Sequence, residues 1–375
     1  MLAHAKAFRA YNGTKPMGFA ANADWYEPLT LCEADQQAAV NAMVWEIGLF
    51  WDLLTTGAWA PEIAAVVHHP RLPVLSVEDV ELLRGAHGSV YYQNMYTGAY
   101  AWATGANAAS DCQSHRASWR SPSEEPADFT TDSAAGKGAI NPITNETIGA
   151  LAPGSSWLHF TPTGLPKLQR WIAARYLQHI PDLKLVVTEN GWGGAYPTKE
   201  QAVDDLQRCE YYRQYIGNMS KFTPDGKYGK GPLMLSEQAP TILGYFAWSL
   251  MDNFEWNDGY SQRFGITYVD YCGPHNNFTC KQTRTPKLTA SWFTELLKDR
   301  SFRDQPHLWE SLPECKWYSG ANGTEPASSS LRNWEVVGAV GLVVAAVCVG
   351  VAVVRRHKRQ EAHESNEPLA QVTAW

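Results

Sequence analysis

The sequence predicts an α/β fold built on a parallel sheet, and the order of its apolar segments carries that prediction. Four strand candidates are nearly continuous apolar runs, at residues 16–25, 89–96, 183–188 and 242–250. Helical patterns separate these runs, and strands buried on both faces between helices are typical of parallel sheets. Polar and aromatic residues follow the strands, where α/β barrels carry their sites. We therefore expect four strand–helix units, which make half of a (β/α)8 barrel.

Local signals support each element of the first half. Its helix candidates are residues 2–11, 33–54 and 76–85. Ser76 and Asp79 predict a capping-box start for the third helix, and Gly85 ends it. The aromatic run at residues 89–96 has high strand propensity. Residues 97–145 contain Gly, Ser, Asp and Pro throughout, so we expect a long loop there.

The second half repeats the alternation. Its helix candidates are residues 162–180, 199–221 and 286–300. Residues 183–188 read LKLVVT, a run that predicts a buried strand. Residues 242–250 form the last apolar strand, and a long insertion at residues 222–240 precedes it.

Composition indicates a globular protein and excludes one class of partner. The chain has 375 residues, of which 45% are hydrophobic and 18% charged. The net charge is −7, and the one basic tract is at residues 355–359, so nucleic-acid binding has no electrostatic footprint. The 16 Trp and 17 Tyr residues suit a large core. They also suit a sugar-binding cleft, which needs flat apolar plates with polar edges.

A membrane span is predicted near the C-terminus. Residues 336–354 carry no charge and are long enough, as a helix, to cross roughly 30 Å of hydrocarbon. The basic tract that follows places the tail, 355–375, in the cytosol and residues 1–318 outside. Residues 319–335 resemble a short stalk. We therefore expect a single-pass type I membrane protein with its large domain extracellular or lumenal; the alternative is a buried soluble helix.

Cysteines and glycosylation sequons bear on the same topology. Five Asn-X-Ser/Thr patterns precede or abut the span, at Asn12, Asn145, Asn218, Asn277 and Asn322. Six cysteines lie outside the span, an even number that permits disulfides. We favour a Cys272–Cys280 pair across a short loop, with unpaired buried thiols as the alternative. The first ten residues lack the apolar core of a signal peptide, so we expect an N-terminally truncated sequence.

One carboxylate stands at the end of a predicted strand. Glu189 lies in the tetrapeptide Thr188-Glu-Asn-Gly191, directly after the apolar run. At the mouth of a parallel sheet such a group could be a nucleophile, a general base or a metal ligand. Asn-Gly after a strand also commonly forms a turn. From this tetrapeptide alone both interpretations remain open.

A longer segment suggests the family. Residues 244–270 read GYFAWSLMDNFEWNDGYSQRFGITYVD and resemble the closing signature of family 1 glycoside hydrolases, the β-glucosidase and lactase type. Residues 2–5 (LAHA) and 23–28 (ADWYEP) look like the helix after the family's fourth barrel strand and its fifth strand end. Residues 94–96 (NMY) and 188–191 (TENG) are similar to its Asn-Tyr-Tyr and nucleophile motifs. The resemblance implies the C-terminal half of a TIM barrel, strands five to eight.

The resemblance also implies roles for the matched residues. Glu189 would be the nucleophile that forms a covalent glycosyl-enzyme, and Tyr96 would donate a hydrogen bond that orients it. Glu255 would accept hydrogen bonds from sugar hydroxyls, assisted by Trp256. The reaction would be a retaining double displacement on a β-linked glucoside, galactoside or fucoside, without a cofactor or a metal.

Further aromatic and polar residues complete the expected sugar site. Trp248 would stack on the glycone ring, Phe264 would close that subsite, and Trp157 would form the platform for the aglycone. Asn94 would contact the substrate. For the aromatic residues the alternative is core packing. Arg208 and Arg263 lie in family-like contexts, and their roles stay open.

The family's proton donor, the Glu of an Asn-Glu-Pro strand end, has no counterpart before the predicted span. Asn366-Glu367-Pro368 matches the motif but follows the span, in the predicted cytosolic tail. We therefore expect the chain itself to be inactive. An alternative function is a non-catalytic, klotho-like binding protein with a glycosidase fold, and a half-barrel with a structural role is the third.

Overall fold

The computed structural model describes the first of two compact units, and it does so in segments. The units are Met1–Trp317 and Tyr318–Trp375. The described residues are 1–67, 70–104, 112, 132–222, 224, 231–238, 240–272, 281–298 and 311–318. The predicted stalk, span and tail, 319–375, lie outside them. Among the described helices, none has the length and apolar character needed to cross a bilayer.

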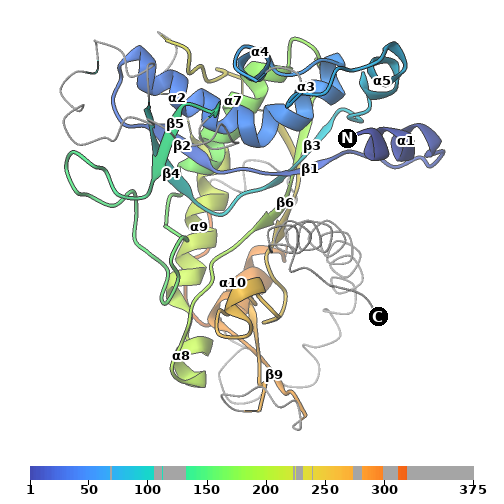
Figure 1. Ribbon diagram of the computed structural model, residues 1–375. Coiled ribbons are helices and arrows are strands. Elements are labelled where there is room, and N and C mark those ends of the chain that lie inside the picture. The colour runs from blue at the N-terminus through green and yellow to red at the C-terminus, as the bar shows by residue number, and fades with distance from the viewer. Residues whose placement is uncertain are drawn as a thin grey trace, which may run out of the picture. The chain divides into compact units, whose positions relative to one another are not determined.

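A four-stranded parallel sheet forms the centre of the first unit (Figure 1). Its order is β1 (Ala20–Asn22), β3 (Val90–Asn94), β6 (Lys184–Asn190) and β7 (Thr241–Ala247). The register pairs Asn22 with Asn94, Asn94 with Glu189 and Asn190 with Ala247. The carboxyl ends of all four strands therefore meet at one edge. The predicted sheet and its sequential order are confirmed.

Helices cross over between successive strands. The first helix is α1 (Leu2–Ala10), and β1 to β3 is spanned by α2 (Glu33–Met43), α3 (Leu49–Thr56), α4 (Pro61–Ala64) and α5 (Val77–Leu83). Helix α7 (Gly164–Tyr176) leads to β6, and α8 (Lys199–Val203) and α9 (Leu206–Lys221) lead to β7. The chain continues through η4 (Trp256–Asp258), β8 (Thr267–Val269), β9 (Arg284–Pro286) and α10 (Leu288–Leu296). Helix α9 packs between α7 and α10.

Two of the predicted helices are interrupted in the structure. The 33–54 helix contains a π-helical turn, η1 (Val44–Gly48), between α2 and α3. The 199–221 helix breaks at Asp204 and Asp205, whose backbone leaves the helical region, and the Asp205 carboxylate pairs with Arg208. The capping box at Ser76 and Asp79 is confirmed, with 3.1 and 3.2 Å between the paired atoms. Such a cap contributes about 1 kcal/mol.

The prediction of a loop over residues 97–145 is wrong in part. Strands β4 (Gly98–Ala103) and β5 (Ala135–Gly138) lie within it. They join β2 (Trp25–Pro28) in a second sheet, with β2 parallel to β4 and β4 antiparallel to β5. Residues 98–103 alternate small and aromatic side chains, a strand pattern that the surrounding polar composition obscured. Residues 105–111 and 113–131 lie outside the described part.

Aromatic side chains fill much of the interior. The Trp51 and Tyr91 rings lie 4.6 Å apart between centroids, and both residues are fully buried. On helix α9, Tyr211 and Tyr215 stack at 4.0 Å. These rings confirm core packing as one use of the high aromatic content. The Tyr211 and Tyr215 hydroxyls also reach the segment that follows β3.

Disulfides cross-link distant parts of the unit. Cys32 is bonded to Cys112, and Cys209 on α9 is bonded to Cys315. Cys272 is disulfide-bonded as well. Its expected partner, Cys280, lies outside the described residues. The alternative of unpaired thiols is therefore wrong for these five cysteines.

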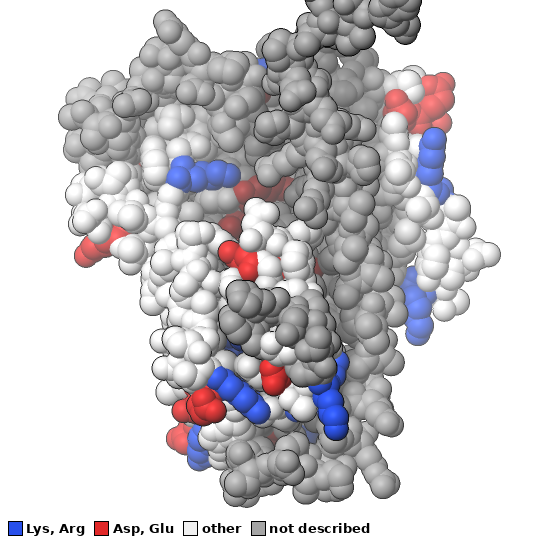
Figure 2. Space-filling view, turned by 60° about the horizontal axis from the view of Figure 1, so that its bottom comes forward, with Lys and Arg blue, Asp and Glu red and all other residues white. Residues whose placement is uncertain are grey.

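Charge is mixed on the face displayed in Figure 2. Among the described residues there, Lys and Arg side chains lie next to Asp and Glu side chains instead of forming a patch of one sign.

Candidate active site

Glu189 lies at the carboxyl end of β6 and is hydrogen-bonded to Tyr96. The residue is 8% exposed, and its Oε2 accepts a hydrogen bond of 2.6 Å from the Tyr96 hydroxyl. Burial raises the pKa of Tyr96 well above its usual value, and the negative charge of Glu189 adds to the effect. Tyr96 therefore stays a hydrogen-bond donor at neutral pH, aimed at a carboxylate that has little contact with water.

The backbone around Tyr96 is held by side chains from two other elements. The Tyr211 and Tyr215 hydroxyls of α9 both donate to the Tyr96 carbonyl, at 2.6 and 3.2 Å. The Asn190 amide donates 2.7 Å to the carbonyl of Met95. Because Asn190 follows Glu189 on the same strand, the segment that carries the donor is fixed to the strand that carries the acceptor.

A second buried carboxyl, Glu255, lies on the segment after β7. It is 6% exposed, and its Oε1 accepts a hydrogen bond of 3.2 Å from the Trp248 indole N–H. Burial raises the pKa of Glu255 to about 7, the Trp248 hydrogen bond opposes this, and the charge of Glu189 adds to it. The two carboxyl groups are thus close enough to interact.

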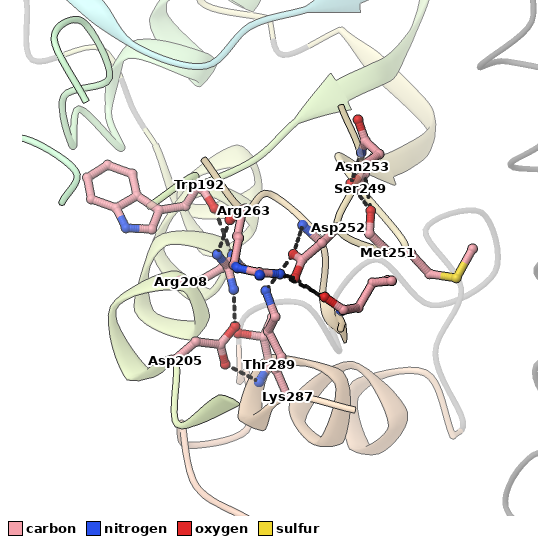
Figure 3. Close-up of polar contacts among 12 residues, drawn as sticks. Trp192, Asp205, Arg208, Ser249, Met251, Asp252, Asn253, Arg263, Lys287 and Thr289 are labelled. Atoms are coloured by element: carbon pink, nitrogen blue, oxygen red, sulfur yellow. Dashed lines mark hydrogen bonds and ion pairs between the residues drawn. The ribbon is translucent and has the colours of Figure 1, made fainter. Parts of the chain in front are cut away.

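A buried ionic network ties this segment to the rest of the fold (Figure 3). The Asp252 carboxylate accepts from Arg263 Nη1 at 2.7 Å and from Lys287 Nζ at 2.8 Å. Arg208 pairs with Asp205 and donates 2.5 Å to the Arg263 carbonyl. Arg208 and Lys287 are fully buried. The sequence left the roles of Arg208 and Arg263 open, and the structure places both in this network.

Within the network Asp252 holds the chain on both sides of η4. Its carboxylate also accepts from the backbone N–H of Gly265 at 3.1 Å and of Val269 at 3.3 Å. Trp248 and Glu255 precede η4, while Phe264 follows it. One buried carboxylate, which lies between Trp248 and Glu255 in the sequence, therefore joins the segment before η4 to the segment after it that carries Phe264.

Three aromatic rings gather beside Glu189. Trp157 and Phe264 are nearly parallel, at 16° and 6.5 Å between centroids, and Tyr96 meets each edge-on at 6.0 Å. Phe264 is 5% exposed and Trp157 is 44% exposed. The cluster therefore runs from the buried carboxylate to the surface.

The remaining predicted site residues, Trp256 and Asn94, lie outside the aromatic cluster beside Glu189. Trp256 begins η4 and is 64% exposed, so it is not part of the buried group. The side-chain oxygen of Asn94 accepts 2.6 Å from Thr188 Oγ1, which links β3 to β6 beside Glu189. The structure thus brings together Glu189, Tyr96, Phe264 and Trp157, and it separately pairs Glu255 with Trp248.

Sequence reasoning missed a second acidic pair near Tyr96. Asp24 follows β1, and its carboxylate accepts from the Thr97 N–H at 3.4 Å. Glu46, in the π-helical turn, accepts 3.2 Å from the Asp24 N–H, 2.5 Å from the Tyr26 hydroxyl and 3.3 Å from Lys137. Burial, and then the charge of Glu46, raise the pKa of Asp24 to about 7. Asp24 was visible as a polar residue after a strand, whereas no local signal marks Glu46.

Among the described residues, the grouping with metal-ligand atoms close together is Cys32, Asp35 and Cys112. Its two cysteines are joined in a disulfide, so they offer no thiolate to a metal.

Residues 1–302 match the family model described as glycosyl hydrolase family 1. The chain belongs to this family. Beta-glucosidase 25 of Oryza sativa subsp. japonica is 33% identical over 313 residues, covering 80% of this chain and 54% of the relative. Beta-glucosidase 44 of Arabidopsis thaliana is 33% identical over 307 residues, with 80% and 51% covered. The chain spans about half the length of the curated relatives it matches.

Solved structures of the family agree with the fold. The rice Os3BGlu6 β-glucosidase matches with a TM-score of 0.63 and 27% identity, over 79% of this chain and 55% of that one. The Trichoderma harzianum β-glucosidase matches with 0.61 and 28%, over 78% and 55%. These family 1 enzymes are (β/α)8 barrels. The parallel sheet described above is therefore part of the family's barrel, as the sequence predicted.

Proposed function

We propose that the chain carries the nucleophile and the sugar-binding half of a retaining β-glycosidase site. The observation that supports it best is the 2.6 Å hydrogen bond from Tyr96 to Glu189 at the mouth of the parallel sheet. Family membership supports hydrolysis of β-glycosides as the reaction class. The relatives named above are β-glucosidases, so they lend no support to the klotho-like alternative.

In the proposed mechanism Glu189 attacks the anomeric carbon. A bond forms between its carboxylate oxygen and that carbon while the bond to the leaving oxygen breaks, which gives a covalent glycosyl-enzyme. Water then attacks the same carbon and releases Glu189. Tyr96 fixes the orientation of the attacking carboxylate through its hydrogen bond, and partial burial keeps competing water away from the nucleophile.

The other residues bind the sugar. Glu255 accepts hydrogen bonds from sugar hydroxyls, with Trp256 next to it, and Trp248 offers its ring to the glycone. Phe264 closes the glycone subsite, and the half-exposed Trp157 receives the aglycone. Asn94 contributes through the β3 end beside Glu189. An aromatic face suits the apolar side of a pyranose, and buried carboxyls suit its hydroxyls.

In the proposed mechanism the proton donor is not among the candidate site residues of this 375-residue chain. Retaining hydrolysis needs a second carboxyl about 5–5.5 Å from the nucleophile. The one Asn-Glu-Pro of the sequence, Asn366-Glu367-Pro368, lies beyond the predicted span. The chain expressed alone is therefore expected to leave aryl β-glucosides intact.

We also propose that the large domain is exoplasmic and anchored by residues 336–354. The disulfides Cys32–Cys112 and Cys209–Cys315 support an oxidising compartment for this domain. In sealed vesicles whose exoplasmic face is outside, added protease is expected to digest the large domain and to leave an epitope on the tail intact. A tail digested from outside would contradict this topology.

Labelling with a slow 2-fluoro β-glucoside tests the catalytic assignment. The protein isolated from its source organism is labelled, digested and mapped by mass spectrometry. A modified peptide containing Glu189 is expected, and the Glu189→Gln variant, in which the amide cannot attack, is the matched control. A label on any other residue would refute the assignment. Turnover of an aryl β-glucoside by the isolated chain would refute the placement of the proton donor.

A further inference from the structure

The described residues contain three of the five sequons, and their surroundings differ. Asn12 lies after α1, Asn145 lies in a hairpin between β5 and α7, and Asn218 lies within α9. Asn277 and Asn322 are outside the described residues. The reaction class proposed above makes no use of these asparagines, so the question of their modification is separate from catalysis.

The disulfides indicate a compartment in which this domain could be N-glycosylated. Five cysteines are bonded, in Cys32–Cys112, in Cys209–Cys315 and at Cys272. Such bonds form and persist in oxidising compartments such as the endoplasmic reticulum lumen. A domain that folds there meets N-glycosylation at any Asn-X-Ser/Thr that is accessible.

Asn145 sits at the tip of a backbone-held hairpin. Ile140 and Thr147 form an antiparallel bridge, and the Asn141 N–H donates 2.8 Å to the Glu146 carbonyl. The Asn145 N–H donates 2.8 Å to the Asn141 carbonyl, and its φ of 60° is in the left-handed region that asparagine tolerates. All residues from 142 to 147 are exposed. The hairpin is thus held by its backbone, and the Asn145 amide is open to modification.

Asn218 has the opposite setting. It lies inside the α9 helix, is half-buried, and its carbonyl accepts 3.0 Å from the Phe222 N–H. Helical hydrogen bonding and partial burial therefore constrain this asparagine. Gly217 next to it packs against Leu312, in the segment bonded through Cys315.

Asn12 is exposed, but an aromatic ring covers its sequon. A Cβ placed on Gly13, the central residue, would lie 2.2 Å from the Tyr11 hydroxyl oxygen. That hydroxyl also accepts 3.3 Å from the Lys15 N–H. The Tyr11 side chain therefore folds over the segment that follows Asn12, whereas nothing comparable covers the described hairpin around Asn145.

We propose that Asn145 carries an N-linked glycan in the folded protein and that Asn218 does not. The glycan marks the 139–148 hairpin as a surface that stays in solvent in the folded protein. No other polypeptide segment can pack closely over a hairpin tip that bears a branched, hydrated oligosaccharide. The modification is independent of hydrolysis, so it holds whether or not Glu189 is the nucleophile.

Occupancy mapping by mass spectrometry tests this on protein from the source organism. Peptide-N-glycosidase in heavy-oxygen water converts a glycosylated asparagine to labelled aspartate. We expect near-complete label at Asn145 and none at Asn218, together with an intact Cys209–Cys315 cross-link in the unreduced digest. An unlabelled Asn145 or a labelled Asn218 would overturn the proposal. Absence of the cross-link would contradict the oxidising compartment from which glycosylation is argued.

Variants expressed in a eukaryotic secretory host separate modification from folding. Asn145→Gln and Thr147→Ala each remove the sequon, and the second leaves the asparagine in place. Both should lose the mass of one glycan, while Asn218→Gln should keep the wild-type mass. If Thr147→Ala carried the same glycan mass as wild type, the assignment would be contradicted. A fold defect could not explain that result, because misfolding does not add a glycan.

Discussion

The Tyr96 hydroxyl lies 2.6 Å from Glu189 Oε2, and the two residues come from neighbouring strand ends that are 93 positions apart in the sequence. The Tyr96 carbonyl is in turn held by Tyr211 and Tyr215. The backbone that carries the donor thus cannot move without breaking contacts to α9, and the Tyr96 ring itself packs edge-on against Trp157 and Phe264. This preorganisation gives a direct prediction for the Tyr96 hydroxyl.

Tyr96→Phe should slow covalent labelling of Glu189 by a slow 2-fluoro glycoside. A hydrogen bond to a charged group contributes about 1.5–3 kcal/mol, which corresponds to a rate loss of roughly 10- to 100-fold. Tyr91→Phe is the matched control, because the buried Tyr91 hydroxyl has no hydrogen-bond partner in the described structure. Its labelling rate should match wild type. Equal rates for the Tyr96 variant and wild type would contradict the role.

Sugar affinity and stability should depend on pH in opposite ways through Glu255. Its pKa of about 7 in the folded state is above the ordinary value of 4.5. The folded state therefore binds more protons between those values, and the stability contribution, up to ~3 kcal/mol, is lost as pH rises from 5 to 8. The ionised form is the better acceptor for sugar hydroxyls, so affinity should rise over that range.

Calorimetric binding of gluconolactone and urea unfolding at pH 5 and pH 8 check both effects. Glu255→Gln should flatten the pH dependence of affinity and reduce that of stability. A variant whose pH dependence equals that of wild type would show that another group titrates.

The strand ends could be predicted because their signals are local. The apolar run before Glu189 and the aromatic run before Tyr96 each predict a strand by themselves. Parallel strands with helical crossovers then bring their carboxyl ends together. The motif resemblance placed Trp248, Glu255 and Phe264 in one contiguous segment, and within it the structure pairs Trp248 with Glu255.

What could not be predicted depends on contacts between distant segments. Glu46 looks like any polar residue of a helix, and its contact with Asp24 depends on a π-helical turn that no periodicity shows. Arg208 pairs with Asp205 at a break between α8 and α9 that the helical pattern over residues 199–221 does not show. Strands β4 and β5 were hidden because polar composition over residues 97–145 outweighed a short alternating pattern.

Glu46→Gln should reduce the dependence of stability on pH. Removing its charge takes away the second cause of the raised pKa of Asp24, so that pKa should fall toward its ordinary value. Because a raised carboxyl pKa makes the fold lose stability as pH rises from 5 to 8, the variant should lose less over that range. Urea unfolding at the two pH values measures this. Glu81→Gln, at an exposed position on α5, is the control and should keep the wild-type slope.

Asp252→Asn should destabilise the fold severely. The substitution leaves Arg263 and the fully buried Lys287 without their shared carboxylate, at 2.7 and 2.8 Å in wild type. Breaking a buried ion pair from one side costs about 3–5 kcal/mol. Glu295→Gln removes one partner of the exposed Lys298 pair and should cost less than about 1 kcal/mol. Denaturant unfolding of both variants decides the matter, and comparable losses would show that the Asp252 network stabilises no more than a surface ion pair.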